Sequence, residues 1–208
     1  MQDITNHINL LADRIHDMRT TKPRILMAIA GAPGSGKSTL AEELSRRMSL
    51  QKVPNVVVPM DGFHLDNSIL ETHNWLQRKG APETFDTGGM LRLVAAMRAG
   101  EDVVAPRFDR TRDISIAGAV HVPADCPLVI MEGNYLMFDE EPYATLAKMW
   151  DLTARIDTPM PELRARLIQR WLSQNHSRAT ATRRAESNDI PNAQRVIDKA
   201  IPCDFNLS

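Results

Sequence analysis

Apolar residues along the chain fall into two patterns: short dense runs, and longer segments in which they recur every three or four positions. Dense runs of strand length occupy 24–30, 127–132 and 152–156, and a β-branched run occupies 55–60. Such runs are typical of parallel strands that are buried on both faces. A final short strand is expected at 205–207.

The periodic segments predict amphipathic helices between these strands. Apolar residues follow a helical spacing in 3–19, 38–48, 87–99, 160–173 and 192–200. The first helix has a single apolar face, so it packs either against the body of the protein or across a homodimer interface. The alternation of strands and helices predicts an α/β fold of three layers, with helices on both faces of a central parallel sheet.

Three segments break this alternation and are expected to border a ligand site. Residues 67–86 mix polar, aromatic and helix-breaking types without a clear period, as functional loops do. Short strands at 103–105 and 114–117 predict a hairpin-like flap over about 101–122, with charged residues at its tip. Arginines among small polar residues predict a mobile helical lid over about 170–190.

Composition limits the class of protein without choosing an activity. A chain of 208 residues with 43% hydrophobic residues can form one domain, 1–208, with a substantial core. Its formal net charge of −1 supplies no basic field, so neither nucleic acid nor a membrane surface is an expected partner. Cys126 and Cys203 stand far apart in the sequence and form no C-x-x-C motif. We therefore expect two reduced core residues of a cytoplasmic protein rather than a disulfide or a metal site. The spacing of the histidines argues against a zinc site.

One stretch carries a specific chemical signature. Residues 31–38 fit the phosphate-binding pattern G-x-x-x-x-G-K-[ST] and lie between a predicted strand and a predicted helix. Glycines let backbone N–H groups turn toward a phosphate chain, and the helix presents its positive end to the same anion. Lys37 would contact the β- and γ-phosphates, and Ser38 would bind Mg²⁺. With ATP and Mg²⁺ as cofactors, the expected nucleotide-binding residues are Gly31, Ala32, Pro33, Gly34, Ser35, Gly36, Lys37, Ser38 and Thr39.

Two carboxylates follow predicted strands and should meet this loop, because ligands of open parallel sheets bind at the carboxyl ends of the strands. Asp61 is the expected general base, and Glu132 is the expected metal-associated carboxylate. Glu132 follows four apolar residues, where a carboxylate is costly without a metal or a cation. The alternative for Asp61 is a turn-forming role, because Asp-Gly is a common turn dipeptide. His64 shares this turn and is an expected substrate contact.

Arginines of the predicted lid would stabilise the charge that moves during phosphoryl transfer. Arg170 and Arg178 are favoured among them, because they stand at the beginning of the lid. We expect Arg170 to be catalytic, together with Asp61 and Lys37, and Arg178 to contact the nucleotide. A closed lid would also exclude water and limit wasteful hydrolysis.

Further motifs resemble those of a known group of enzymes. After the phosphate loop come Met-Asp-Gly-Phe-His at 60–64, Arg-Lys-Gly-Ala-Pro-Glu-Thr-Phe-Asp at 78–86, Pro-Arg-Phe-Asp-Arg at 106–110 and Glu-Gly-Asn-Tyr at 132–135. Together they resemble the uridine kinase, phosphoribulokinase and bacterial pantothenate kinase group of P-loop kinases. They are most similar to bacterial nucleoside/nucleotide kinase-like proteins, often described as fructose transport system kinases.

The resemblance implies a P-loop NTPase fold and gives roles to individual residues. It implies that Asp61 is the catalytic aspartate and that Glu132 is the metal-associated carboxylate. The implied substrate contacts are Asp61, His64, Arg78, Lys79, Phe85, Asp86, Arg107, Arg110 and Tyr135. The chain lacks much of the acceptor-binding structure of pantothenate kinases, and Phe-His stands where uridine kinases usually have serine and tyrosine. Both differences argue against those two acceptors.

Three classes of function are compatible with a phosphate loop. The leading interpretation is an ATP-dependent kinase that phosphorylates a hydroxyl of a small metabolite, a sugar or a nucleoside-like molecule. A nucleotide-binding regulatory ATPase is the second, and a nucleic-acid remodelling ATPase is the third. A regulatory switch needs neither a base nor an acceptor site, so Asp61 and 78–86 favour the kinase. The third class needs a basic surface or an added domain, and the composition indicates neither.

Overall fold

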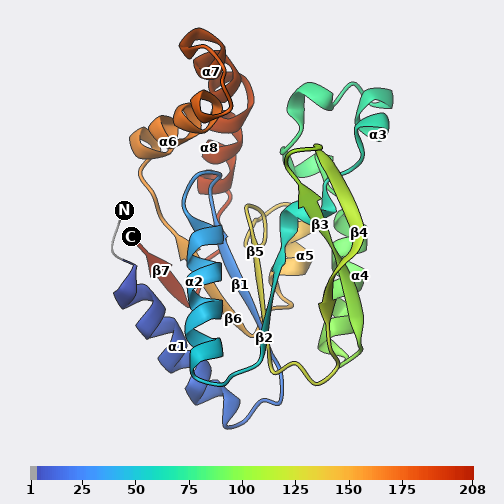
Figure 1. The fold of residues 1–208 in the computed structure, drawn as a ribbon, viewed down its shortest axis with the longest axis vertical. Helices are drawn as coiled ribbons and strands as arrows, with labels where there is room; N and C mark the ends of the chain where they lie inside the picture. Colours follow the sequence, from blue (N-terminus) through green and yellow to red (C-terminus); the bar gives the residue numbers. More distant parts are fainter. Residues whose placement is uncertain (1–3) are drawn as a thin grey trace.

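The computed structural model describes residues 4–208 and is built around a five-stranded sheet in which every pairing is parallel (Figure 1). The strands are β1 Ile25–Gly31, β2 Asn55–Pro59, β5 Leu128–Gly133, β6 Leu152–Ile156 and β7 Phe205–Leu207, in the order β2-β5-β1-β6-β7. β1 and β5 are buried along their whole length, which explains why their sequences are continuous apolar runs.

Helices cover both faces of the sheet, which confirms the predicted three-layer fold. The helices are α1 Thr5–Arg19, α2 Lys37–Leu50, α3 Asn67–Thr72, α4 Thr87–Arg98, α5 Tyr143–Ala147, α6 Met160–Ser173, α7 Arg178–Arg184 and α8 Ile190–Asp198. Successive residues of a strand face opposite sides, so Ile25 packs in the core with α1 and α2, whereas Leu26 packs with α4 and α5. Asp3, which the sequence places in the first helix, lies outside the described residues.

The predicted flap is a two-stranded antiparallel sheet, β3 Val103–Asp109 and β4 Ile114–Val122, which stands beside the main sheet (Figure 1). Both strands are longer than the sequence pattern predicted. β3 continues through charged residues to Asp109, opposite Ile114, and β4 continues to Val122, opposite Val103. The register shifts between Ala105 and Arg107, as at a β-bulge. Close by, 67–86 contains α3 and two short 3₁₀ turns, Leu76–Arg78 and Pro82–Thr84.

A lid made of α6, α7 and α8 rises beyond the phosphate loop and faces the flap and α3 across the top of the molecule (Figure 1). Much of the segment that was predicted to be mobile is helical. α7 continues into a π-helical turn, Ala185–Asp189, and this turn leads directly into α8. The sequence pattern predicts a helical lid and a helix at 192–200, but it does not mark the bounds of α7 or the π-helical turn, because their buried positions include the small residues Ala181 and Ala185.

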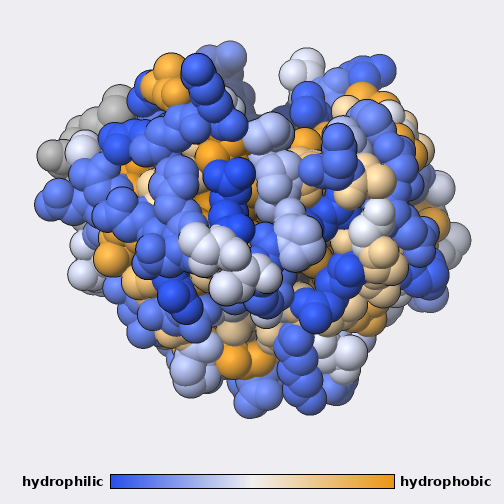
Figure 2. Space-filling model, turned by 90° about the horizontal axis from the view of Figure 1, so that it is seen from below, coloured by the Kyte–Doolittle hydropathy of each residue, from blue (hydrophilic) through white to orange (hydrophobic). Residues whose placement is uncertain are grey.

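Hydrophilic side chains lie mainly at the surface and apolar side chains gather in the interior, as in other globular domains. The end of the molecule opposite the lid is mainly hydrophilic, with hydrophobic side chains in small scattered groups (Figure 2). The buried apolar residues gather in two clusters, one on each face of the sheet. Within 4–208, no helix combines the length and the apolar composition that crossing a bilayer requires.

Candidate active site

The phosphate loop, 31–38, leaves the carboxyl end of β1 and leads into the N-terminus of α2. Gly34 and Gly36 have φ angles of 83° and 101°, a left-handed conformation that strains residues with a β-carbon. No described side chain caps α2, so the first N–H groups of this helix are available to an anion. The loop therefore has the conformation and the donors that a phosphate chain requires.

Lys37, the first residue of α2, points into the loop. Its Nζ donates to the carbonyl oxygen of Ala32 at 3.2 Å and to Oδ1 of Asn134 at 2.7 Å. Burial lowers the pKa of Lys37, and the carboxylates of Glu132 and Asp61 oppose this effect. Because both of its hydrogen-bond acceptors are uncharged, the ammonium can turn to a phosphate without breaking an ion pair.

The sheet brings Ser38, Glu132 and Asp61 to the same edge. Glu132 is in register with Ile29 of β1 and with Pro59 of β2, so the phosphate loop and Asp61 follow on either side of it. Ser38 Oγ donates to Glu132 Oε1 at 3.1 Å, and Glu132 is only 7% exposed. Burial raises the pKa of Glu132, and the Lys37 ammonium opposes this effect.

Ser38 and Glu132 together fit a magnesium ion that is shared with a nucleotide. They offer a hydroxyl and a carboxylate, which are ligand types that Mg²⁺ prefers. Among residues 4–208, no cluster of three or more His, Cys, Asp and Glu side chains could hold a metal. Mg²⁺ would therefore take most of its ligands from phosphates and water. The ion would also offset the cost of burying Glu132.

Asp61 stands in a short 3₁₀ turn, Met60–Phe63, that lies against the flap. A β-carbon on Gly62 would lie 2.3 Å from the carbonyl oxygen of Pro106 in β3, so this close approach requires glycine. Oδ2 of Asp61 accepts a hydrogen bond from Arg110 at the flap tip. Oδ1 has no hydrogen-bond partner within the described chain and can accept a hydroxyl proton from a ligand.

Aromatic rings line the side of the site that faces the flap. The His64 ring lies between Phe85 and Phe108, with centroid distances of 4.2 Å and 4.6 Å. Nδ1 of His64 lies 2.7 Å from the carbonyl oxygen of Asp61, to which it donates. Burial lowers the pKa of His64, so the imidazole is neutral at pH 7. Its Nε2 is then an acceptor.

Lys79 connects the 67–86 segment to the flap tip. Its Nζ donates to Oδ1 of Asn67 at 2.7 Å and to the carbonyl oxygen of Asp113 at 3.0 Å. It also forms an ion pair with Asp113 Oδ1 at 2.9 Å and lies 5.0 Å from the centre of the Phe108 ring. Lys79, which the sequence predicts as a substrate contact, is therefore already bound to Asn67 and Asp113.

The lid contributes a buried carboxylate and two arginines. Asp189, at the end of the π-helical turn, is 8% exposed and accepts a hydrogen bond from Trp171 Nε1 at 2.6 Å. It also pairs with Arg170 at 3.1 Å. Arg184 lies over the Trp171 ring, with its guanidinium carbon 4.9 Å from the ring centre.

These parts surround one cavity of about 930 Å³ between the phosphate loop, the flap and the lid. Its size is at the upper end of the range of about 300–1,000 Å³ for small-molecule sites. The predicted site residues that line it are Pro33, Gly34, Gly36, Lys37, Ser38, Thr39, Asp61, His64, Lys79, Phe85, Arg110, Glu132 and Arg170. Residues that sequence reasoning missed include Asn67, Phe108, Asp113, Asn134 and Asp189. Phe108 and Asn134 belong to the motifs quoted above, and Asn67, Asp113 and Asp189 lie in the three segments that were expected to border a ligand site, but no pattern singles out these three side chains.

A second cavity of about 930 Å³ lies on the other flank of the phosphate loop. It is lined by Ser35 and Gly36, by Arg166 of α6 and by Ile197 of α8, among others. Gly36 lines both cavities, so a chain of phosphates across the N-terminus of α2 would connect them. Within the described residues, the Ser35 hydroxyl is buried without a partner. Of the other predicted loop residues, Ala32 lines this second cavity and Gly31 lines neither.

Two predicted substrate contacts are held away from the first cavity by structural bonds. Tyr135 is completely buried, and its hydroxyl donates to the carbonyl oxygen of Gly80 at 2.7 Å. Burial raises the pKa of Tyr135 well above its ordinary value. Asp86 is exposed and caps α4, where it accepts a hydrogen bond from Gly89 N at 2.7 Å. Both residues shape the site from outside.

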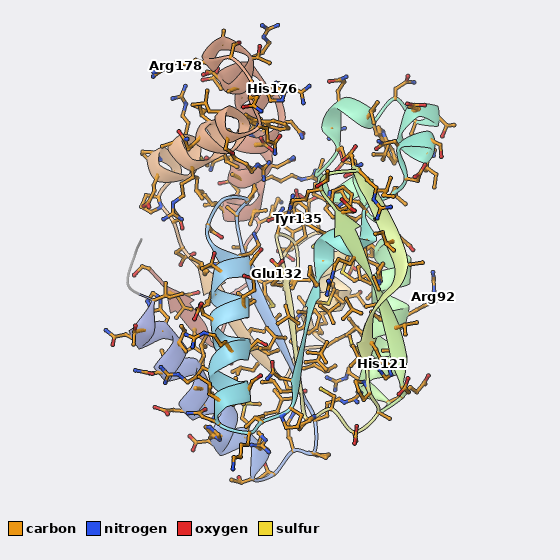
Figure 3. All side chains as sticks on the ribbon, in the orientation of Figure 1. Arg92, His121, Glu132, Tyr135, His176 and Arg178 are labelled. Carbon is orange, nitrogen blue, oxygen red and sulfur yellow. The ribbon has the colours of Figure 1, made fainter. Side chains whose placement is uncertain are left out.

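Three predicted arginines also lie outside the cavity lining. Arg78 is paired with Glu83. Arg107 precedes Phe108 in β3, and because neighbouring strand residues face opposite sides, only Phe108 reaches the cavity. Arg178 is exposed on the outer side of the lid, whereas His176 lies on the side that faces the cleft (Figure 3).

Several known proteins similar to this chain are described as kinases. Residues 26–197 match the model of the Phosphoribulokinase / Uridine kinase family. The Escherichia coli (strain K12) protein YggC, itself uncharacterized, is 35% identical over 202 residues, which cover 94% of this chain and 83% of that protein. A "putative uridine kinase" of Schizosaccharomyces pombe is 29% identical over 207 residues, which cover 95% of this chain and 88% of that protein. The crystal structure of a "putative fructose transport system kinase" from Silicibacter sp. TM1040 has a TM-score of 0.89 and 46% identity, and the match covers 95% of this chain and 98% of that chain.

Proposed function

Because the chain belongs to the phosphoribulokinase/uridine kinase family of ATP-dependent kinases, we propose that it phosphorylates a hydroxyl of a sugar or nucleoside-like metabolite. One observation carries the proposal. Asp61, whose Oδ1 has no hydrogen-bond partner among residues 4–208, lines the same cavity as Lys37 and the phosphate loop. A regulatory nucleotide switch would need the phosphate loop but no base and no acceptor space beside it. The name of the Silicibacter structure supports a sugar as one candidate acceptor.

In this proposal the nucleotide spans the two cavities. Its phosphates lie on the N–H groups of the phosphate loop, with Lys37 at the β- and γ-phosphates. The nucleoside part lies in the second cavity, between the loop and Arg166. Ser38 and Glu132 would hold Mg²⁺ directly or through water, and the bound ion would supply positive charge to the transferred phosphoryl group.

Asp61 acts on the acceptor. The acceptor hydroxyl donates a hydrogen bond to Oδ1 of Asp61 and gives up its proton there as its oxygen bonds to the γ-phosphorus. The bond between the γ-phosphorus and the bridging oxygen breaks, so the products are the phosphorylated acceptor, ADP and a proton. Lys37 and Arg170 stabilise the charge that spreads over the phosphoryl oxygens. The lid excludes water from the reaction.

ADP release with Mg-ATP tests this proposal. The acceptor panel holds fructose, other sugars, ribulose 5-phosphate, uridine, cytidine and pantothenate. With an accepted substrate, Asp61→Asn is expected to lower kcat by about 100-fold or more, as for the loss of a general base, while nucleotide affinity stays unchanged. Asp86→Asn is the matched control, because this aspartate caps α4 outside the cavity and asparagine is also a good cap. Normal turnover by Asp61→Asn would contradict the assigned base.

A further inference from the structure

The cations on the acceptor side of the cavity are already neutralised. Two of them line this side, Lys79 from the 67–86 segment and Arg110 from the flap tip. Lys79 forms an ion pair with Asp113 at 2.9 Å, and Arg110 forms one with Asp61. Both carboxylates line the cavity as well. The acceptor side therefore presents two matched ion pairs and no surplus positive charge.

Two arginines immediately outside the lining are paired in the same way. Arg78 pairs with Glu83, and Arg112 pairs with Asp109 at 2.8 Å. These residues flank the acceptor side on the 67–86 segment and on the flap tip. On this side of the lining, within the described residues, a negative group on the acceptor would thus find no unpaired cation, and it would lie beside Asp61 and Asp113.

The donor side and the lid differ from this arrangement. The ammonium of Lys37 is hydrogen-bonded only to the uncharged oxygens of Ala32 and Asn134. Arg184 lines the cavity and stacks on Trp171, and within the described chain it has no carboxylate partner at ion-pair distance. Within the described chain, the cavity cations without a carboxylate partner therefore include Lys37 at the phosphate loop and Arg184 on the lid, and neither belongs to the 67–86 segment or the flap tip.

From this asymmetry we infer that the acceptor is an uncharged, hydroxyl-bearing molecule, and that Asp113 excludes acceptors with a phosphate or carboxylate group. The inference rests on the proposed kinase function and narrows it. An anionic acceptor would have to take Lys79 or Arg110 from its partner, which would leave a carboxylate unpaired beside a second negative charge. A neutral acceptor leaves both pairs intact and can use the amide groups of Asn67 and Gln77, which line the same side.

A labelling experiment tests the charge of the acceptor without knowing its identity. A deproteinised cell extract is separated by anion exchange into a neutral and an anionic fraction, and each is incubated with the enzyme and γ-labelled Mg-ATP. We expect a new labelled phosphate ester from the neutral fraction and none with Asp61→Asn. A labelled ester from the anionic fraction alone would overturn the inference while leaving the kinase proposal intact. No labelled ester from either fraction would overturn the kinase proposal itself.

A charge-neutralising variant tests the role of Asp113. Panthenol and pantothenate, and ribulose and ribulose 5-phosphate, are compared as competitors of the labelled reaction, because each pair differs in one anionic group. In the wild type we expect the neutral member to compete about 10-fold better or more, because like charges at a binding site are strongly disfavoured. Asp113→Asn leaves Lys79 unpaired and is expected to reduce this ratio by about 10-fold, by the same effect.

Asp109→Asn is the matched control for this variant. It removes the same charge from the partner of Arg112, four residues away and outside the cavity lining, and the asparagine oxygen can still accept from the backbone of the flap tip. In Asp109→Asn, the neutral member of each pair should outcompete the anionic member by the same factor as in the wild type. Equal ratios in wild type and Asp113→Asn, or equal changes in both variants, would overturn the role of Asp113. Stronger competition by the anionic members in the wild type would overturn the inference as a whole.

Discussion

His64 illustrates how one side chain links the stability of the site to pH. Its ring is packed between Phe85 and Phe108, and its Nδ1 is bound to the carbonyl oxygen of Asp61. The buried ring disfavours the charged form and lowers the pKa of His64 from its ordinary value of 6.5. The unfolded chain therefore takes up a proton at this residue more readily than the folded chain does.

This difference predicts how the free energy of unfolding depends on pH. The contribution of His64 is fully present above pH 6.5 and is lost as the pH falls below this value. Urea unfolding at pH 7.5 and 5.5 measures the loss, which should be smaller in His64→Asn than in the wild type. His73→Asn, at an exposed position, is the control and should keep the wild-type pH dependence. An unchanged pH dependence in His64→Asn would contradict the burial argument.

At the level of secondary-structure elements, the π-helical turn Ala185–Asp189 determines where the lid carboxylate points. A π-turn inserts an extra residue into the helical repeat, and such turns are frequent at functional sites. Here the turn ends at the buried Asp189, which binds both Arg170 and Trp171 of α6. The orientation of Arg170 toward the cavity thus depends on a residue from a different helix.

We predict that Asp189 and Arg170 act as a unit. Arg170→Ala and Asp189→Ala should each lower kcat by about 10- to 100-fold, below the cost of losing a central oxyanion donor. The double variant should be little worse than either single one, because both remove the same interaction. Asp189→Asn should recover part of the activity, because its amide oxygen can still accept a hydrogen bond. Glu186→Ala, from the same turn but paired with Arg164 on the surface, is the control. Additive losses would contradict the coupling.

The elements also show why some of this structure could be predicted from the sequence. β1 and β5 are buried on both faces, so their burial appears directly as apolar runs, and the phosphate loop between β1 and α2 has a fixed pattern. In the lid, the helical patterns at 160–173 and 192–200 correspond to α6 and α8, but α7 and the π-turn could not be placed in the same way. Small residues such as Ala181 and Ala185 fill their buried positions, and no periodic pattern of large apolar residues marks the π-turn.

At the scale of the whole molecule, the site depends on contacts between segments that are distant in the sequence. Arg195 of α8 pairs with Glu83 of the 67–86 segment at 3.1 Å and with Glu140 beyond β5. Asn188, at the base of the lid, donates to the carbonyl oxygen of Lys79 at 2.8 Å. No local pattern encodes such contacts, which is why the sequence analysis gave no role to Arg195. These bonds connect the lid to the acceptor side of the cavity.

The connection through Arg195 predicts a loss that is shared between stability and acceptor binding. Arg195→Ala removes an ion pair on each of two carboxylates and a contact with the Phe138 ring. Because the side chain is 35% exposed, we expect the free energy of unfolding to fall by only about 1–2 kcal/mol, in the lower range for bonds between charged groups. Without this link the 67–86 segment is less firmly held, so KM for the acceptor should rise while KM for ATP stays unchanged.

Two further variants separate this link from a general effect of removing an arginine. Arg195→Lys should recover little of the loss, because a lysine ammonium cannot reproduce the guanidinium fork that contacts Glu83 and both oxygens of Glu140. Arg46→Ala removes an exposed pair with Glu43 and should change the unfolding free energy by less than about 0.5 kcal/mol. Urea unfolding and initial-rate kinetics on the same preparations provide both measurements. A rise in KM for ATP equal to that for the acceptor would show that Arg195 supports the whole domain rather than the acceptor side.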